Sequence, residues 1–152
     1  MPGEQTLILL KPDAVQRDLI GALLARFEQA GFSIDHLATV EPTTSLLEQH
    51  YQEHVDKDFF PGLREYMQQD HVVACIISRD NAVTAARQVI GDTEPASAQP
   101  GTIRGDYGDD SYEQADAQDR GLHNLVHASE NKQVAKREIQ LWFDDQGAEA
   151  RK

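Results

Sequence analysis

Four cationic or imidazole side chains of this chain could act together on an anion. Lys11 directly follows an apolar run, and Arg87 lies in a segment with helical spacing. Arg104 lies in a glycine-rich turn, and His127 lies at the end of a short apolar run. Each residue alone is more often a solvated or paired surface group. Lysine and arginine at strand ends and in a glycine-rich loop can converge on phosphate oxygens, which guanidinium groups bind bidentately.

The histidines could serve as nucleophiles or as metal ligands. A neutral imidazole has a lone pair that can attack near pH 7, so a histidine beside a phosphate site is a candidate nucleophile. The segment GLHNLVHASE places His123 and His127 four residues apart, and His50 and His54 have the same spacing. Either pair could bind a metal from one face of a helix. No cysteine or carboxylate set at ligand spacing accompanies them, so we predict no dedicated metal site.

Short apolar runs and helical periodicities define the elements that must position these residues. We predict strands at 6–10, 32–40, 71–78 and 124–129. We predict a helix start after Lys11, helices at 18–31, 81–91 and 130–143, and two helical pieces within 43–69 that break around 56–62. Alternation in 32–40 places Ile34, Ala38 and Val40 on one side. His36 falls on that side, and we assign it no role.

Two regions lack such a pattern. Prolines and glycines punctuate the polar, acidic stretch 92–121, and a loop of this length in a compact domain is usually functional or partly disordered. The tail 144–152 is polar, and we expect it to be loose. The order of the remaining elements predicts one domain over 1–152 and an α+β fold, a ferredoxin-like sandwich in which helices cover one face of a four-stranded antiparallel sheet.

Charge and composition restrict the partners. With 26 acidic and 14 basic residues the formal net charge is −12, which disfavours nucleic acid and anionic membranes as partners. The start of the chain carries no basic leader, and no stretch is apolar enough to span a membrane, so we expect a cytoplasmic protein. The single cysteine, Cys75, reads as a core residue. Arginine exceeds lysine and aspartate exceeds glutamate, a balance that also suits adaptation to high salt.

Several separate motifs resemble the nucleoside diphosphate kinase family in its own order. They are LLKPDAV, HYQEHVDKDFF, ARQVIGDTEPASAQPGTIRGDY, NLVHASE and AKREIQLWF, and together they extend from Thr6 to Phe143. The resemblance implies ping-pong transfer of the terminal phosphate of a nucleoside triphosphate, usually ATP, to a nucleoside diphosphate through a phosphohistidine. By its place in the N-x-x-H-x-S pattern, His127 matches the family's nucleophile, whereas His123 matches no role.

The same resemblance assigns the residues around His127. Glu138 matches the carboxylate that fixes the tautomer of the nucleophile, although Glu130 is closer in sequence. We expect Glu130 to open the last helix and Ser129 to be its N-cap as well as an active-site hydroxyl. The catalytic set that the resemblance implies is therefore His127, Glu138, Lys11 and Ser129.

The resemblance also assigns the nucleotide site. Lys11, Tyr51, Arg87, Thr93 and Arg104 match positions that hold phosphates, and Asn124 and Lys11 match positions that reach the sugar hydroxyl. Phe59 matches the aromatic on which the base stacks, with Leu63 as an apolar neighbour, although Phe59 and Phe60 could both be core residues. Stacking without base-edge hydrogen bonds implies broad base specificity. Mg²⁺ is expected between the nucleotide's own phosphates, without a protein cage.

One departure from the family pattern is an enlarged loop at about 105–123, before Asn124. In the family this region takes part in subunit packing, so the resemblance implies a homo-oligomer with a hexamer favoured and a tetramer or dimer as alternatives. Gly121 or Leu122 stands where the family has a small apolar residue beside the base. Two other functions stay open: a module that binds nucleotide without turnover, and a phosphohistidine carrier that acts on proteins.

Overall fold

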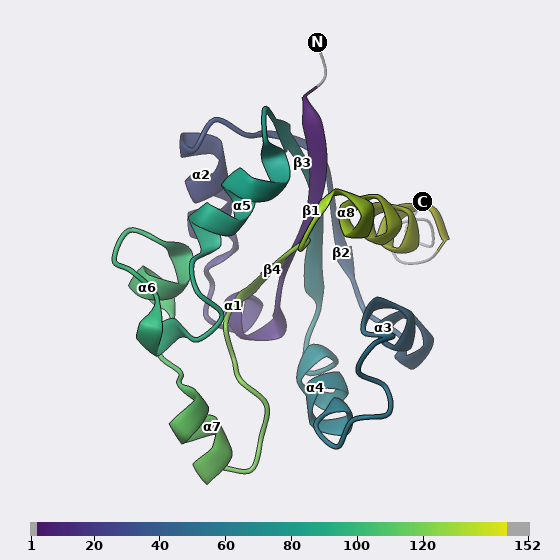
Figure 1. The fold of residues 1–152 in the computed structure, drawn as a ribbon, viewed down its shortest axis with the longest axis vertical. Helices are drawn as coiled ribbons and strands as arrows, with labels where there is room; N and C mark the ends of the chain where they lie inside the picture. Colours follow the sequence, from purple (N-terminus) through teal and green to yellow (C-terminus); the bar gives the residue numbers. More distant parts are fainter. Residues whose placement is uncertain (1–2, 146–152) are drawn as a thin grey trace.

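The fold is built on one four-stranded sheet, seen in a computed structural model that describes residues 3–145 (Figure 1). The strands are β1 (Glu4–Leu10), β2 (Ser33–Val40), β3 (Val72–Arg79) and β4 (Val126–Ala128), in the order β2-β3-β1-β4. Every neighbouring pair is antiparallel. The predicted four-stranded antiparallel sheet is therefore confirmed, although β4 is shorter than the predicted strand at 124–129.

Helices cover both faces of the sheet, so the prediction that they cover one face is wrong. On one face, Ile8, Leu10 and Cys75 pack with α1 (Pro12–Gln16), α2 (Ile20–Gln29) and α5 (Ala82–Ile90). Glycines with positive φ follow two of these helices, since φ is 91° at Gly31 and 86° at Gly91. Figure 1 shows α2 and α5 together on the left of the strands.

The other face is covered by α3 (Thr44–His50), α4 (Phe60–Met67) and α8 (Lys132–Ile139). Here Leu7, Leu9 and Ala74 pack against the fully buried Trp142, which lies in η2, a π-helical turn at Gln140–Asp145 that continues α8. Alternate residues of β1 and β3 thus enter two different cores, which explains why both strands read as continuous apolar runs. The first two residues of the tail predicted to be loose are helical, and the rest of it lies outside the described residues.

A β-bulge interrupts the edge strand β2. Its pairing with β3 shifts register between Ile34 and His36. Because a shift of one residue turns every later side chain to the other face, Ile34 packs in the first core, whereas Ala38 and Val40 pack in the second. The prediction that these three residues share one side is therefore wrong.

The stretch 92–121 contains three short helices. They are η1 (Pro95–Ser97), α6 (Ile103–Tyr107) and α7 (Tyr112–Ala117). The carboxylate of Asp110, which is 3% exposed, accepts two hydrogen bonds from Arg120, at 2.7 and 3.0 Å, and one from the backbone N–H of His123 at 2.7 Å. These bonds fasten the two ends of the segment that carries α7. The region predicted as a long loop thus contains helical pieces of three to six residues, which show too few turns to reveal a period.

Asn131 caps the last helix. Its side chain accepts the backbone N–H of Val134 at 2.9 Å, and α8 begins at Lys132. The predictions that Ser129 is the N-cap and that Glu130 opens the helix are wrong, because both residues lie before the cap. Among residues 3–145, no helix is both long and apolar enough to cross a membrane.

Candidate active site

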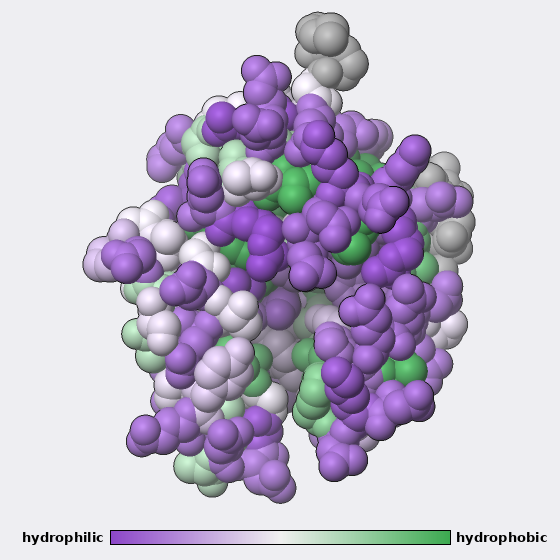
Figure 2. Space-filling model, in the orientation of Figure 1, coloured by the Kyte–Doolittle hydropathy of each residue, from purple (hydrophilic) through white to green (hydrophobic). Residues whose placement is uncertain are grey.

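The predicted site residues meet at a cavity of about 270 Å³ between the C-terminal end of β1, the short strand β4 and the start of the turns after α3. Figure 2 shows this view of the molecule as largely hydrophilic and hollowed near its centre. Eight of the predicted residues line the cavity: Lys11, Tyr51, Arg87, Thr93, Arg104, Asn124, His127 and Glu138. They come from segments that are far apart in the sequence, so the fold alone brings them together.

His127 contacts a buried carboxylate. Its Nε2 lies 2.8 Å from Oε1 of Glu138, and the Ser129 hydroxyl donates to the same oxygen at 2.7 Å. Burial opposes ionisation of Glu138, but His127 and Ser129 together hold the pKa of this carboxyl down at about 2. An ionised carboxylate only accepts hydrogen bonds, so the proton of the neutral imidazole lies on Nε2 and Nδ1 keeps its lone pair. The predicted pairing of His127 with Glu138, eleven residues away, thus has the geometry to fix the tautomer.

His50 stands behind this pair and is held neutral. The indole N–H of Trp142 donates to Nδ1 of His50 at 3.0 Å, so that nitrogen must be unprotonated. Burial, helped by His127, lowers the pKa of His50 to about 3. Its ring meets the His127 ring edge-on, with the centroids 4.7 Å apart. Although Nδ1 is 3.6 Å from Glu138, the indole proton makes this a contact between neutral and charged groups rather than an ion pair.

His50, His127 and Glu138 also form a cluster that could hold a metal ion. Nε2 of His127 and Oε1 of Glu138 already bind each other, the same oxygen accepts from Ser129, and Nδ1 of His50 accepts from Trp142. A metal here would have to displace those hydrogen bonds. Two imidazoles and one carboxylate also suit Mg²⁺ poorly, because it prefers oxygen ligands.

Lys11 is buried at the end of β1. Its ammonium donates to Oδ1 of Asn124 at 2.8 Å, and the Asn124 amide donates in turn to the Thr93 carbonyl at 3.0 Å. Burial and the nearby Arg104 lower the pKa of Lys11 to about 7, while Asp13 acts in the opposite direction. Among residues 3–145 no carboxylate pairs directly with this buried ammonium, so it is well suited to bind an anion.

Two arginines bind the outer side of β4. Arg104 donates to the carbonyls of Asn124 at 3.2 Å and Val126 at 2.6 Å, and Arg87 donates to that of Ala128 at 2.9 Å. These alternate carbonyls point away from β1, and the guanidinium groups take the place that a further strand would occupy. Burial and Arg87 lower the pKa of Arg104 to about 10, so it stays charged at neutral pH. Both side chains are thereby fixed at the edge of the cavity.

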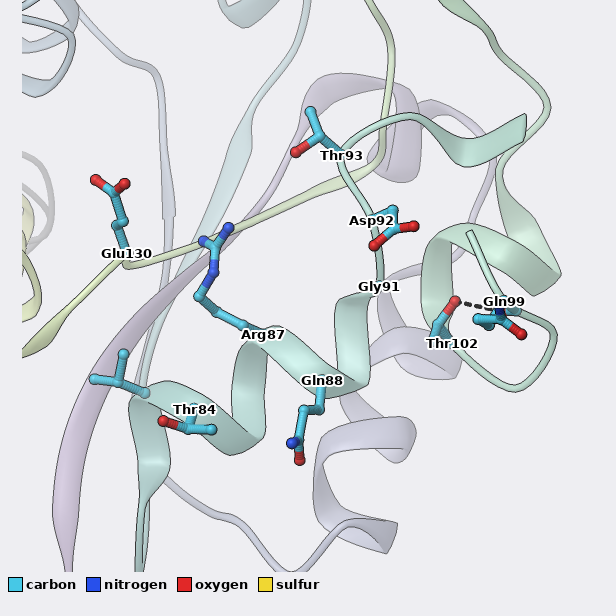
Figure 3. A pocket seen from close by; sticks show the side chains of 10 residues that line it. Thr84, Arg87, Gln88, Gly91, Asp92, Thr93, Gln99, Thr102 and Glu130 are labelled. Atoms are coloured by element: carbon cyan, nitrogen blue, oxygen red, sulfur yellow. Dashed lines mark hydrogen bonds between the residues drawn. The ribbon is translucent and has the colours of Figure 1, made fainter. Parts of the chain in front are cut away.

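A second hollow, of about 540 Å³, adjoins the first one beside α5 (Figure 3). Arg87, Thr93 and Glu130 line both hollows. Figure 3 shows Arg87 extending from α5 toward the segment that carries Glu130, away from Gln88. These three residues therefore lie where the two hollows meet.

The predicted base-binding residues lie outside the cavity lining. Phe59 is 51% exposed and Phe60 is 4% exposed, so only Phe60 is a core residue. Leu63 is partly buried and packs against the second core. His54, which lines the cavity, connects the two areas, since its ring lies 5.3 Å from that of Phe59 and 6.3 Å from that of Tyr51. Among the described residues, the buried hydroxyl of Tyr51 has no hydrogen-bond partner.

Several residues that shape the site were not predicted to do so. From the sequence, His50 is considered only as half of a histidine pair, and Trp142 only falls within the predicted helix at 130–143. Their contact spans 92 positions, which no local spacing could reveal. His123, for which we predicted no role, stacks on Tyr66 with the ring centroids 4.4 Å apart.

Comparisons with a family model, with related sequences and with solved structures all point to one family. Residues 4–148 match the family model described as nucleoside diphosphate kinase. The nucleoside diphosphate kinase of Synechococcus elongatus is 41% identical over 140 residues, which are 92% of this chain and 87% of that protein. Nucleoside diphosphate kinase 1 of Arabidopsis thaliana is 43% identical over 142 residues, with 93% and 89% covered.

Solved structures agree. An NDP kinase from Pyrobaculum aerophilum superposes with a TM-score of 0.87 at 34% identity, covering 95% of this chain and 97% of that one. A transition-state mimic of the nucleoside-diphosphate kinase from Borrelia burgdorferi, with bound vanadate and ADP, has a TM-score of 0.88 at 32% identity, with 93% and 88% covered. Because the family model spans nearly the whole chain and the relatives align over most of their own length, this chain belongs to the nucleoside diphosphate kinase family.

Proposed function

We propose that this protein transfers the terminal phosphate of a nucleoside triphosphate, usually ATP, to a nucleoside diphosphate through a phosphohistidine on His127. The observation that carries the proposal is the hydrogen bond of 2.8 Å between Nε2 of His127 and the ionised Glu138. Because Nε2 carries the proton in this hydrogen bond, Nδ1 keeps its lone pair and is the nucleophilic atom. Covalent catalysis of this kind divides the transfer into two similar half-reactions, which suits an enzyme that balances nucleotide pools.

In the first half-reaction, Nδ1 of His127 attacks the terminal phosphorus. A P–N bond forms as the P–O bond to the nucleoside diphosphate breaks, and the electron pair leaves with that oxygen. As the ring becomes positively charged, the Nε2 proton stays shared with Glu138, whose charge stabilises it. A second nucleoside diphosphate then attacks the same phosphorus with a terminal phosphate oxygen, and the P–N bond breaks to restore neutral His127.

Fixed cations would stabilise the phosphoryl group during both steps. Phosphoryl transfer depends mainly on positioning and on neutralising the equatorial oxygens. Lys11, Arg87 and Arg104 line the cavity, and their hydrogen bonds to Asn124 and to the carbonyls of residues 124, 126 and 128 hold them in place before substrate arrives. The Tyr51 hydroxyl, which has no hydrogen-bond partner within residues 3–145, is a further donor for a phosphate oxygen. Thr93 and Asn124 complete the proposed nucleotide contacts.

Magnesium fits this cavity as a companion of the nucleotide. The carboxylates of Glu53 and Glu130 line the cavity and offer oxygen ligands of the kind that Mg²⁺ prefers. We propose that they would hold the ion together with the nucleotide's phosphates, where its charge would help neutralise the transferred group.

The base would lie outside the cavity, against Phe59. This ring is half exposed, and Lys57 lies over it with its ammonium 6.0 Å from the centroid. Leu63 would add an apolar contact. Stacking on an aromatic ring accepts the face of any base, which predicts little discrimination between bases.

We also propose that the chain forms a homo-oligomer in the cytoplasm, with a hexamer favoured. The edge strand β2 leaves one side of the sheet open, and its Leu37 is 54% exposed. A long open edge with an exposed apolar side chain is a common surface for pairing between chains. Light scattering of the purified protein would distinguish a hexamer from a tetramer, a dimer or a monomer.

The kinase proposal is tested by labelling and chase. The protein is mixed with γ-labelled ATP and Mg²⁺, and the label is expected on protein in an acid-labile, alkali-stable form. A second nucleoside diphosphate should then remove it. His127→Ala should abolish labelling and His123→Ala should retain it. The proposal fails if the wild-type protein takes up no label, or if the chase leaves the label in place.

The same experiment separates the two alternatives. A module that binds nucleotide without turnover would bind ATP and take up no label. A carrier that acts on proteins would take up label and keep it in the presence of nucleoside diphosphates.

A further inference from the structure

The chain has a strained residue directly before β4. Leu125 is buried and has a φ of 72°, which non-glycine residues rarely adopt. Its two neighbours in sequence are Asn124, which binds Lys11, and Val126, which begins the strand of His127. A left-handed residue at this point sets the direction of Asn124 relative to the strand, so whatever holds it also holds the site.

The segment Lys11–Asp13 holds both backbone groups of Leu125. The N–H of Lys11 donates to the Leu125 carbonyl at 2.8 Å, and the Leu125 N–H donates to Oδ2 of Asp13 at 3.1 Å. Strained conformations persist only where the surroundings fix them, and they concentrate at functional sites. Lys11 has an assigned part in the nucleotide site, whereas Asp13 is not among the predicted site residues.

The second oxygen of Asp13 reaches another helix. The Tyr66 hydroxyl donates to Oδ1 of Asp13 at 2.5 Å, and Tyr66 lies on α4, the helix that follows Phe59. The Tyr66 ring is 2% exposed and is enclosed by the Lys11 ammonium, 5.9 Å from its centroid, and by the stacked ring of His123. Asp13 therefore joins three segments that meet at the nucleotide site: the end of β1, the start of β4, and α4.

We propose that Asp13 is a positioning residue of the nucleotide site, whose carboxylate ties the Tyr66 hydroxyl to the backbone of Leu125 and so sets Asn124 and Lys11 for binding. The inference rests on the proposed kinase function, since it concerns the same nucleotide. Asp13 is not among the residues that line the cavity. It acts through Asn124 and Lys11, and its loss should weaken nucleotide binding more than it slows phosphoryl transfer.

Asp13 also acts on the charge of Lys11. The polar and charged groups that face this ammonium are Arg104 on α6, Asp13 on α1, the Tyr66 ring on α4, His50 on α3 and Asn124. Only Asp13 raises the pKa of Lys11, which burial and Arg104 bring down to about 7. Nucleotide binding should therefore weaken as the pH rises through the neutral range, and removal of the Asp13 charge should move that loss to lower pH.

The test compares three variants with the wild-type protein. Asp13→Asn removes the charge, and Tyr66→Phe removes only the hydroxyl that donates to Asp13. Glu4→Gln is the matched control, because Glu4 also accepts a backbone N–H, that of Val83 at 2.8 Å, but lies at the opposite end of β1. For each protein we would measure kcat and KM with a nucleoside diphosphate, ADP binding between roughly pH 6 and 9, which brackets the ordinary range of such a shifted lysine, and the melting temperature.

Asp13→Asn should raise KM about tenfold, the usual effect of one hydrogen bond to a charged group, with a smaller change in kcat. The pH at which ADP binding is lost should fall. Tyr66→Phe should raise KM less, because it removes only one hydroxyl. A raised KM at an unchanged melting temperature would show that the rise in KM does not come from misfolding. The inference is overturned if KM and the pH of binding loss in both variants match those of Glu4→Gln. Absence of a phosphoenzyme in the wild-type protein would instead overturn the kinase proposal.

Discussion

Removal of the Glu138 carboxylate should slow phosphoenzyme formation without preventing nucleotide binding. Glu138 accepts the Nε2 proton of His127 at 2.8 Å and the Ser129 hydroxyl proton at 2.7 Å. A hydrogen bond to a charged group contributes about 1.5–3 kcal/mol. If the whole energy of the bond to His127 stabilises the transition state, in which the ring becomes charged, its loss raises the barrier by that amount. Glu138→Ala should then slow the first half-reaction roughly ten- to a hundredfold.

Glu138→Gln should slow the first half-reaction by at least about tenfold. The amide oxygen can still accept from Nε2, but it carries no charge to stabilise the forming cation. The amide NH₂ can also donate to Nε2, which would favour the tautomer with its proton on Nδ1 and block attack. Ser129→Ala is the comparison variant, because it removes the other donor to Glu138 and leaves the bond to His127 in place.

The assay is single-turnover formation of the phosphoenzyme from saturating γ-labelled ATP, followed by rapid quench. ATP binding is measured separately on each variant. The reasoning is wrong if folded Glu138→Ala forms the phosphoenzyme at the wild-type rate, because His127 would then need no acceptor on Nε2. It is also wrong if Ser129→Ala is slower than Glu138→Ala.

The same substitution should alter acid stability. The pKa of Glu138 is held at about 2 in the folded protein and is 4.5 as the ordinary value, so ionisation of this carboxyl stabilises the folded state by about 3 kcal/mol at neutral pH. A lowered carboxyl pKa gives stability that is complete above about 4.5 and is lost as the pH falls toward 2. Glu138→Gln should remove this part of the pH dependence, as measured by urea unfolding at several pH values.

Three further outcomes are expected. Trp142→Phe leaves the buried Nδ1 of His50 without its donor, so it should lower the free energy of unfolding by about 1–3 kcal/mol in denaturant titrations, and unchanged stability would contradict the role given to the indole N–H. Asp110 has its pKa held at about 2, against burial, by Arg120 and the His123 N–H. Asp110→Asn should therefore cost about 2 kcal/mol at neutral pH and make the segment 105–123 easier to cleave in limited proteolysis, whereas the wild-type protein should itself lose this contribution below about pH 4. If the acidic composition reflects salt adaptation, the melting temperature should rise with molar KCl, and a flat response would refute that interpretation.

The parts of the fold that sequence reasoning found are those with long, regular patterns. The apolar runs of β1 and β3 and the helical spacing of α2 and α5 each extend over several turns or residues, and flanking glycines mark their ends. Continuous apolar runs such as those of β1 and β3 are typical of strands covered on both faces, so the prediction of a single covered face came from the order of the elements and not from the runs. The bulge in β2 was not predicted. Alternation assumes that successive side chains keep changing faces along the whole strand, and an extra residue at a bulge breaks that assumption.

The candidate site divides in the same way. His127, Glu138 and Lys11 were identified through motifs that resemble a known family, and the fold brings all three to one cavity. The supporting groups were not found, because Asp13, Tyr66, His50 and Trp142 act through contacts that span many positions of the chain. For Ser129, a local sequence pattern led to a wrong prediction of the helix N-cap. A serine before a helix is a common N-cap, but here its hydroxyl binds Glu138 and Asn131 caps the helix.

The two arginines at β4 also bear on the aggregation of this protein. β4 is an edge strand of three residues, and a bare edge is a template for pairing with other chains and for aggregation. Arg104 and Arg87 cover that edge by occupying the carbonyls of residues 124, 126 and 128. A lysine cannot reproduce several donors in one fixed plane. Arg104→Lys would thus keep the positive charge and still expose the edge, so its first symptom should be reduced solubility rather than a simple loss of affinity.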